Sequence, residues 1–208
     1  MKLDVGATRM NLMRLKKRLV LARRGHKLLK DKQEELMRQI LALIEETRAH
    51  RARVEQEMRQ ILGRFAVARS AFPTEYLDEA VMLPSKRVSV KVTTRNIMNV
   101  KVPVFHKEVS GRIRCYGMAT TSSELDLALL ALDELLDPLL TLAEQEKALE
   151  LLADEMEKTR RRVNALEFVL IPSIEETVRF INLKLAETER GELTRLMRVK
   201  EIIRGEEK

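Results

Sequence analysis

The sequence predicts a mainly α protein: a long antiparallel two-helix coiled coil with a small inserted β-hairpin and a short helix at one end. Charged residues make up 34% of the 208 residues and aromatic residues only 3%, with no Trp. This composition is typical of long helices and coiled coils. Apolar residues recur at three- and four-residue spacings near both ends of the chain, the pattern of a coiled-coil seam. Between them, valines alternate with polar residues, which predicts strands.

The first long helix is predicted within residues 1–70, from about Thr8 to Ser70. No proline occurs before Pro73, so nothing in this stretch removes a helical hydrogen bond. A helix of about 63 residues at a rise of ~1.5 Å would be roughly 95 Å long. Its seam is interrupted by polar residues at His26, Gln33 and Thr47. The expected seam residues include Leu12, Leu15, Leu19, Leu29, Leu36, Ile40, Leu43, Val54, Met58, Ile61 and Phe65.

Residues 71–122 predict a short helix followed by a β-hairpin. The short helix covers Pro73–Leu83. In RVSVKVTTRNIMNVKVPVF, Val88, Val90 and Val92 alternate with polar residues, and so do Val100, Val102 and Val104. Two strands joined by a turn around Thr93–Asn96 are therefore expected. Pro103 places the second strand at an edge of the sheet, or lies close to the end of that strand. Residues 107–121 are expected to form an ordered loop.

Residues 123–208 predict the second long helix. Ser122 or Ser123 precedes an acidic residue and an apolar run, as an N-cap residue does. Pro138 and Pro172 lie inside the helix and are expected to kink it, because each lacks a backbone donor. The expected seam residues include Leu149, Leu152, Met156, Val163, Leu166, Leu170, Ile174, Ile181, Leu185, Leu196, Val199 and Ile203.

The charge distribution favours an antiparallel arrangement of the two helices. Residues 1–70 carry a net charge of +10, residues 71–122 of +4 and residues 123–208 of −7. Folding back pairs opposite charges, although a single exposed ion pair contributes under ~1 kcal/mol. Met1 and Lys208 are then expected side by side, with the hairpin at the other end. In this register Leu12, Leu15, Leu19 and Leu29 face Ile181, Leu185, Leu196 and Val199. Asn164 is a candidate polar residue that sets the register.

The residue types that carry catalysis or bind cofactors do not cluster in the sequence. The seven glycines are scattered without a phosphate-binding loop, and the three histidines lie far apart. The single cysteine excludes an intrachain disulfide and a cysteine-based metal cluster, and fits a reducing compartment. No apolar run is long enough to span a membrane, and the N-terminus has no apolar signal-peptide core. We therefore expect a non-catalytic chain without cofactor or metal.

The stretch EKTRRRVNALE, residues 157–167, contains three consecutive arginines, Arg160–Arg162. A net charge of +7 permits binding to nucleic acid, an anionic membrane or an acidic protein. Consecutive helical residues point ~100° apart, however, so the three arginines do not form one phosphate-binding face. The acidic second helix and scarce aromatics also argue against nucleic acid, and the narrow seam argues against a membrane surface. A basic coiled-coil nucleic-acid-binding or scaffold protein remains the alternative interpretation.

Four motifs in order along the chain resemble one known family. TRMNLMRLKKRL (8–19), RGHKLLKDKQEELMRQ (24–39), NIMNVKVP (96–103) and EKTRRRVNALE followed by IP (157–167, 171–172) are similar to the D subunit of the V-type/A-type rotary ATPases, of bacterial type. The resemblance extends over nearly the whole chain. One departure is Ala7, where the family often has Pro.

The resemblance implies a central-stalk rotor. In the family, the paired termini of the D subunit insert into the catalytic A/B hexamer. The hairpin end binds the F subunit of the central stalk and rests on the C subunit, above the membrane ring. Nucleotide-driven closure of the A/B pairs turns the shaft, which couples ATP hydrolysis or synthesis to proton or sodium transport. The expected location is the cytoplasmic side of the cell membrane, peripheral and within the complex, without nucleic acid.

From the resemblance and the pattern together we assign candidate contact residues. The expected hexamer contact consists of Thr8, Arg9, Met10, Arg14, Leu196, Val199 and Ile203. The expected contact with the F subunit consists of Val88, Val90, Val92, Ile97, Val100 and Val102.

Overall fold

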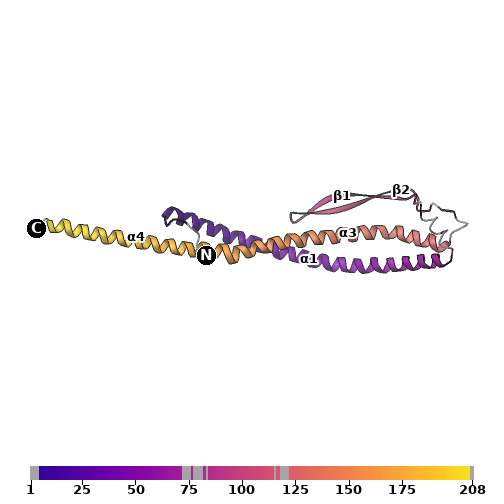
Figure 1. Ribbon diagram of the computed structural model, residues 1–208, viewed down its shortest axis with the longest axis horizontal. Coiled ribbons are helices and arrows are strands. Elements are labelled where there is room, and N and C mark those ends of the chain that lie inside the picture. Colours follow the sequence, from indigo (N-terminus) through magenta and orange to yellow (C-terminus); the bar gives the residue numbers. More distant parts are fainter. Residues whose placement is uncertain are drawn as a thin grey trace. The chain divides into compact units, whose positions relative to one another are not determined.

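The structure, a computed structural model, describes residues 5–71, 76, 82, 84–114, 116–117 and 122–206. The elements are α1 (Arg9–Ala71), β1 (Arg87–Ile97), β2 (Val100–Ser110), α3 (Ser123–Asn164), the π-helix η1 (Ala165–Leu170) and α4 (Ile171–Glu206) (Figure 1). The mainly α class with long helices and one hairpin is confirmed. The predicted short helix lies mostly outside the described residues, although Tyr76 and Met82 are helical. Met1 and Lys208 also lie outside them, and no described helix is long and apolar enough to cross a membrane.

Both predicted helix starts carry a capping side chain. The Asn11 backbone N–H donates to Thr8 Oγ1 at 3.2 Å, and the Leu12 N–H donates to the Thr8 carbonyl at 3.0 Å. Ser122 caps α3 in the same way, because the Leu125 N–H lies 3.4 Å from Ser122 Oγ. Such caps satisfy donors that the first turn of a helix leaves without a partner.

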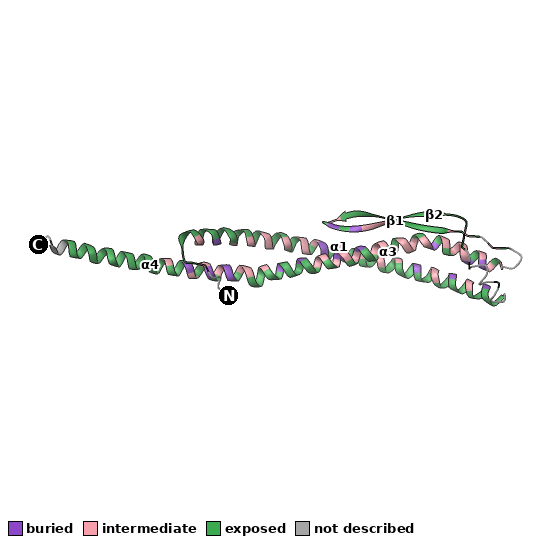
Figure 2. Cartoon of the chain, turned by 45° about the horizontal axis from the view of Figure 1, so that its top comes forward, coloured by how far each residue is buried: buried purple, intermediate pink, exposed green. Residues whose placement is uncertain are grey.

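The chain divides into two compact units. Unit 1 consists of Met1–Glu35 and Glu157–Lys208, and unit 2 of Leu36–Met156. In unit 2, α1 and α3 pack along three buried clusters, shown in purple in Figure 2. Residue numbers rise along α1 as they fall along α3, so the two helices are antiparallel here. The clusters join Leu36 and Ile40 to Ala148 and Leu152, Val54 and Ile61 to Leu135, and Ala68 to Leu125.

The core of unit 1 is smaller. Leu15, Ile174 and Ile181 are buried together, with Leu12, Leu19 and Leu185 packed around them. Three exposed or half-buried pairs run along this core in antiparallel order: Arg9–Glu189 at 2.6 Å, Arg23–Glu175 at 2.6 Å and His26–Glu167 at 3.3 Å. In this unit too, the two helical segments are antiparallel.

Three of the residues expected in the seam lie outside it. Leu196, Val199 and Ile203 are 65%, 51% and 56% exposed, so they do not pack against the leucines of α1. The reason is the register of unit 1. Because Arg9, the first residue of α1, pairs with Glu189, residues 190–203 of α4 extend past the start of α1, and all of them are exposed.

The hairpin turn lies further along the chain than predicted. The strands are paired from Arg87–Ser110 to Ile97–Val100, so the turn is Met98–Asn99 and not Thr93–Asn96. Met98 and Asn99 both have positive φ, 49° and 70°, as the two central residues of a type I′ turn require. Residues 107–110, predicted as loop, belong to β2. The repeated β-branched residues on both sides of the turn allow this longer pairing.

The hairpin lies along the two helices of unit 2 (Figure 1). Near the turn, Val100 and Val102 are buried against Leu36, Ile40 and Leu152. Farther from the turn, polar contacts to α3 replace the apolar ones. Lys86 pairs with Asp133, Lys107 Nζ lies 2.5 Å from Asp137, and the Phe105 backbone N–H donates to the Glu144 carboxylate. The hairpin is thus fixed to the helices along its length.

The two prolines inside the second helical segment have different surroundings. The α-helix α3 continues through Pro138, whose carbonyl oxygen lies 3.2 Å from His50 Nε2. Pro172 is the second residue of α4, which follows the π-helix η1, and the Ile171 N–H before it donates to the Leu166 carbonyl, five residues earlier. The local geometry at Pro172 is therefore wider than that of an α-helix.

Candidate functional site

Two exposed apolar surfaces are the candidates for partner binding. The first lies on the hairpin and consists of Val88, Val90, Val92 and Val109, which we call the hairpin surface. These side chains are 36%, 42%, 61% and 45% exposed. The second, the terminal surface, consists of residues 8–14 and 190–203 in unit 1.

Strand register decides which valines of the hairpin are accessible. Successive side chains of a strand point to opposite faces, so Val88, Val90 and Val92 share one face. Val88 is paired with Val109, which places Val109 on that same face. Val100 pairs with Ile97 and Val102 with Arg95. Because Ile97 and Arg95 are odd-numbered residues of β1, these pairs lie on the opposite face.

Half of the expected contact with the F subunit is therefore not available to another chain. Val100 is 9% exposed and Val102 is 3% exposed, and both pack against the helices of their own unit. Ile97 is half-buried in the same cluster. Val100 and Val102 lie on the face opposite Val88 because they pair with Ile97 and Arg95. Val109 was missed because it fell in the predicted loop.

Cross-strand polar pairs lie on the face of the hairpin opposite the hairpin surface. Lys91 Nζ lies 2.5 Å from Glu108 Oε1, and His106 Nε2 lies 3.1 Å from Thr93 Oγ1. All four residues are exposed and lie on the face opposite the four valines, since Lys91 pairs with His106 in the ladder. The face of the four valines also carries one charged residue, Lys107, which pairs with Val90 and contacts Asp137 of α3.

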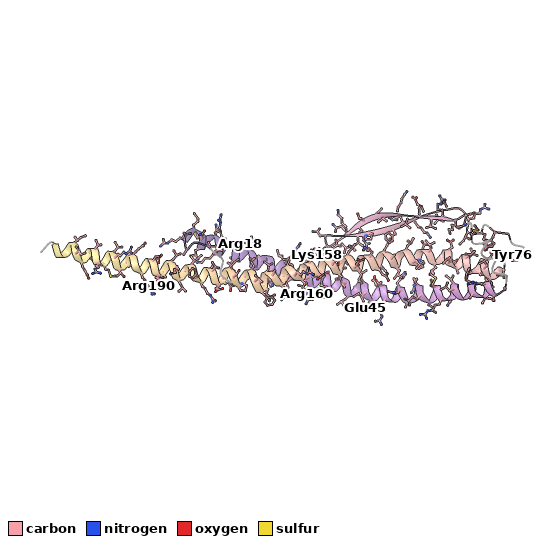
Figure 3. The ribbon with its side chains drawn as sticks, viewed as in Figure 1. Arg18, Glu45, Tyr76, Lys158, Arg160 and Arg190 are labelled. Carbon is pink, nitrogen blue, oxygen red and sulfur yellow. The ribbon has the colours of Figure 1, made fainter. Side chains whose placement is uncertain are left out.

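The terminal surface combines exposed apolar and basic side chains. All seven residues that were expected to contact the hexamer are exposed: Thr8, Arg9, Met10, Arg14, Leu196, Val199 and Ile203. Met10 is 77% exposed and Ile203 is 56% exposed. Four basic residues, among them Arg190, and two acidic residues occur in 190–203. Figure 3 labels Arg190 on α4 and Arg18 on α1 among the basic side chains of this unit.

Further apolar residues on this surface were not assigned from the sequence. Met13, Leu193, Met197 and Ile202 are 61%, 55%, 64% and 57% exposed. Leu193 and Met197 are four residues apart and therefore adjoin on the helix. The signal that could have found them is the continuation of apolar residues in α4 beyond the residue that pairs with Arg9.

The residues expected in the coiled-coil seam differ in burial. Buried are Leu15, Leu36, Ile40, Leu152, Val163 and Ile181. Half-buried are Leu19, Leu29, Met156, Leu166 and Leu185. Asn164, the candidate polar register residue, is exposed. The buried polar residues are instead Thr159, Ser173 and Thr177, which were not singled out because Thr and Ser are frequent on exposed helix faces.

The three arginines lie on the exposed surface of the helix. Arg160, Arg161 and Arg162 are all exposed, and Arg161 pairs with Glu157 one turn earlier. Arg160 is labelled in Figure 3. Among the described residues, no three His, Cys, Asp or Glu side chains are placed to hold a metal ion.

Comparison with known proteins identifies a family and several relatives of this chain. The family of ATP synthase D subunits matches residues 11–201. A V-type ATP synthase D subunit of Clostridium novyi is 49% identical, with 99% of this chain and 98% of the relative covered. Proteins of the same name from Acetivibrio thermocellus and Clostridium botulinum are 50% and 51% identical. These alignments cover 96% and 98% of this chain, and 91% and 96% of the relatives. The chain therefore belongs to the family of ATP synthase D subunits.

Proposed function

We propose that this chain is the central rotor shaft of a V-type ion-translocating ATPase or ATP synthase. Its family membership makes it a non-catalytic subunit of that complex. In the proposed mechanism, nucleotide-driven changes in a catalytic A/B hexamer turn the shaft, and the shaft passes torque to the membrane rotor ring. The complex would lie on the cytoplasmic side of the cell membrane.

The observation that carries this proposal is the combination of paired long helices with exposed apolar surfaces. α1 is a single helix of 63 residues, and buried clusters hold its two parts against α3 in unit 2 and against α4 in unit 1. Packing of this kind resists separation of the helices, because each buried Leu or Ile contributes ~1.5–3 kcal/mol. Such a pair is suited to transmit rotation.

The terminal surface is the proposed contact with the hexamer. Its apolar side chains are exposed and spread around α4, and its basic residues suit an acidic bore. The seven contact residues named from the sequence, with Met13 and Leu193 added, form the proposed set. Exposed apolar side chains make contacts that are not directional, which suits sliding during rotation.

The hairpin surface is the proposed contact with the F subunit. Four exposed valines on one face of a hairpin form an apolar patch that a partner would cover. The C subunit is the proposed link to the membrane ring. We assign none of the described residues to that link.

A crosslinking experiment tests the rotary function. Cys115 is the single native cysteine, so Cys115→Ser provides a background for the variant Leu196→Cys. Crosslinking this thiol to the hexamer with a cleavable reagent should lower ATP hydrolysis by the assembled complex at least ~10-fold, since a fixed shaft raises the barrier by more than ~1.4 kcal/mol. Reductive cleavage should restore the rate. Unchanged hydrolysis after complete crosslinking would refute the rotor function.

A binding experiment tests the hairpin surface independently of the terminal surface. V90K/V92K should weaken capture of the F subunit at least ~10-fold, because two charges would be buried in an apolar contact. The matched control is Ser89→Lys, which adds a charge to the opposite face of the same strand. Both variants should retain helix content and hexamer binding. Equal loss of the F subunit in both, or in neither, would contradict the assignment of the hairpin surface.

A further inference from the structure

Within the described chain, the outer edge of β1 carries backbone groups that pair with no other strand. The sheet has two strands, in the order β1–β2, so each strand has one edge toward its partner and one edge away from it. All residues of β1 from Arg87 to Asn96 are exposed. In β2, by contrast, Val100 and Val102 are buried and residues 103–105 are half-buried. β1 is therefore the outer strand of the hairpin.

The register of the hairpin decides which backbone groups point to that edge. In an antiparallel pair, every second residue exchanges both of its hydrogen bonds with the partner strand, and the residues between them point away from it. A two-residue type I′ turn is closed by a hydrogen-bonded pair, here Ile97 and Val100. Odd-numbered residues of β1 therefore bond to even-numbered residues of β2. The residues of β1 that direct N–H and C=O outward are Val88, Val90, Val92, Thr94 and Asn96.

Two polar contacts agree with this assignment. Phe105 is an odd-numbered residue of β2, and its N–H donates to the Glu144 carboxylate of α3, so it points away from β1. Thr93 Oγ1 donates to the Val104 carbonyl at 3.3 Å. That carbonyl, on an even-numbered residue of β2, therefore lies between the two strands, as the register requires.

The two outer edges of the hairpin differ. Along β2, Glu144 accepts from the Phe105 N–H, and Pro103 has no N–H that needs a partner. Lys107 Nζ of the same strand lies 2.5 Å from Asp137 of α3. β1 contains neither a proline nor a bulge, since its 11 residues pair one to one with β2. A long, regular edge of this kind is a template for a further strand.

The side chains of β1 indicate which strand would fit. One face presents the valines of the hairpin surface, and the other presents Arg87, Lys91 and Arg95, all of them exposed. Lys91 contacts Glu108 of β2 and still remains 69% exposed. A second copy of β1 would bring the same positive charges together on one face, which disfavours self-pairing. A strand that alternates apolar and acidic residues would instead match both faces, because apolar pairs and opposite charges stabilise when they lie across from each other.

We propose that β1 accepts an extended strand of a partner protein at its outer edge, and that this strand alternates apolar and acidic residues. The backbone of the incoming strand pairs with the outward N–H and C=O groups of the even-numbered residues. Its apolar side chains extend the hairpin surface. This inference rests on the proposed contact between the hairpin surface and the F subunit, and it specifies how that contact is made.

Hydrogen exchange resolved to single amides tests the pairing, with the full chain alone and with the purified F subunit. In the chain alone, the amides of Val90, Val92 and Thr94 should exchange at least ~10-fold faster than those of Lys91 and Thr93, because only the latter two bond to β2. Binding of the F subunit should slow the three outward amides at least ~10-fold and leave the other two unchanged. Equal rates for the two sets in the chain alone, or no change at the outward amides on binding, would overturn the inference.

A proline substitution distinguishes backbone pairing from side-chain contact. T94P removes one outward N–H and is compatible with an edge strand, whereas the matched control T94A removes the same side chain and keeps the donor. T94P should weaken capture of the F subunit at least ~10-fold, and T94A should change it less than ~3-fold. The Lys91 and Thr93 amides should keep their protection in T94P. Equal capture by both variants, or loss of that protection, would overturn the inference.

The charge of the partner strand is tested by neutralising β1. R87Q/K91Q should weaken capture of the F subunit at least ~2-fold, because cross-strand charge pairs are lost. The control R64Q/R69Q removes two exposed arginines of α1 and should leave capture unchanged. Equal capture by the two double variants would refute an acidic partner strand. Failure of the parent chain to capture the F subunit would contradict the proposed contact itself, whereas capture without protection of the outward amides would overturn strand pairing alone.

Discussion

Arg9 Nη2 lies 2.6 Å from Glu189 Oε1, and this ion pair marks the register of the two helical segments in unit 1. Arg9 is the first residue of α1, whereas α4 continues from Glu189 to Glu206. The last part of α4 therefore extends past α1, and its side chains up to Ile203 are exposed. The ion pair itself is 78% and 54% exposed at its two side chains, so it marks the register more than it stabilises it.

Removal of residues 190–208 should leave the packed part of unit 1 intact. None of the residues 190–203 is buried, so their loss removes little apolar packing. We expect the melting temperature, measured by circular dichroism, to change by less than ~3 °C, which corresponds to about 1 kcal/mol for a chain of this size. A fall well beyond that value would mean that this part of α4 is covered in the isolated chain. Hexamer binding by the same variant should be strongly reduced.

Leu15→Ala should destabilise unit 1. Leu15 is 5% exposed and packs with Ile174 and Ile181, and truncation of a buried Leu costs about 2–5 kcal/mol. The control is Leu21→Ala on the same helix, where the side chain is 71% exposed. Its effect should stay within about 0.5 kcal/mol. Chemical denaturation followed by exchange protection of residues 9–35 separates the two variants, and similar effects would refute the packing described for Leu15.

Two Gly→Ala substitutions should act in opposite directions. Gly63 lies inside α1 with no atom within 4 Å of an added Cβ, so Gly63→Ala should stabilise by about 0.5–1 kcal/mol. Gly111 has φ of +89°, and an added Cβ would lie 2.1 Å from the Ser85 carbonyl oxygen. Gly111→Ala should therefore destabilise the base of the hairpin by about 1–3 kcal/mol. Urea denaturation of both variants checks the sign, and stabilisation by Gly111→Ala would contradict the described backbone.

Substitutions at Asn99 should report on the hairpin turn. Asn99 has φ of 70° and is exposed, and glycine is favoured at this position of a type I′ turn. Asn99→Gly should slow hydrogen exchange in β1 and β2, with a gain of up to about 1 kcal/mol. Asn99→Val should accelerate exchange, because a β-branched residue is strained at positive φ. If both variants behave like the parent chain, the turn lies elsewhere.

Much of the helical architecture was predictable from local sequence. The first helix was expected from Thr8 to Ser70 and is found from Arg9 to Ala71. The start of α3 at Ser122 or Ser123 was also expected. Both depend on short-range physics: the spacing of apolar residues, the absence of internal proline in α1, and a side-chain oxygen that caps the first turn.

The hairpin was predictable in type but not in register. The alternating valines determined that two strands form. Their alternation continues over more residues than the strands need, so it fits several turns. The tertiary structure decided the turn at Met98–Asn99 by burying Val100 and Val102 against Leu36 and Leu152. A shift of register by one residue would exchange the two faces of a strand, and packing against the helices decides which valines remain exposed.

The sequence by itself determined the mainly α class, the long helices, the presence of a hairpin and the family. Each is recorded in patterns that extend over a few residues or in the order of the motifs. Only the tertiary structure decided that α4 extends past α1, that Asn164 is exposed while Thr159 and Thr177 are buried, and that a π-helix lies before Pro172. These features depend on how one helix is rotated and shifted along another, and a periodic pattern leaves rotation and shift undetermined until the side chains pack.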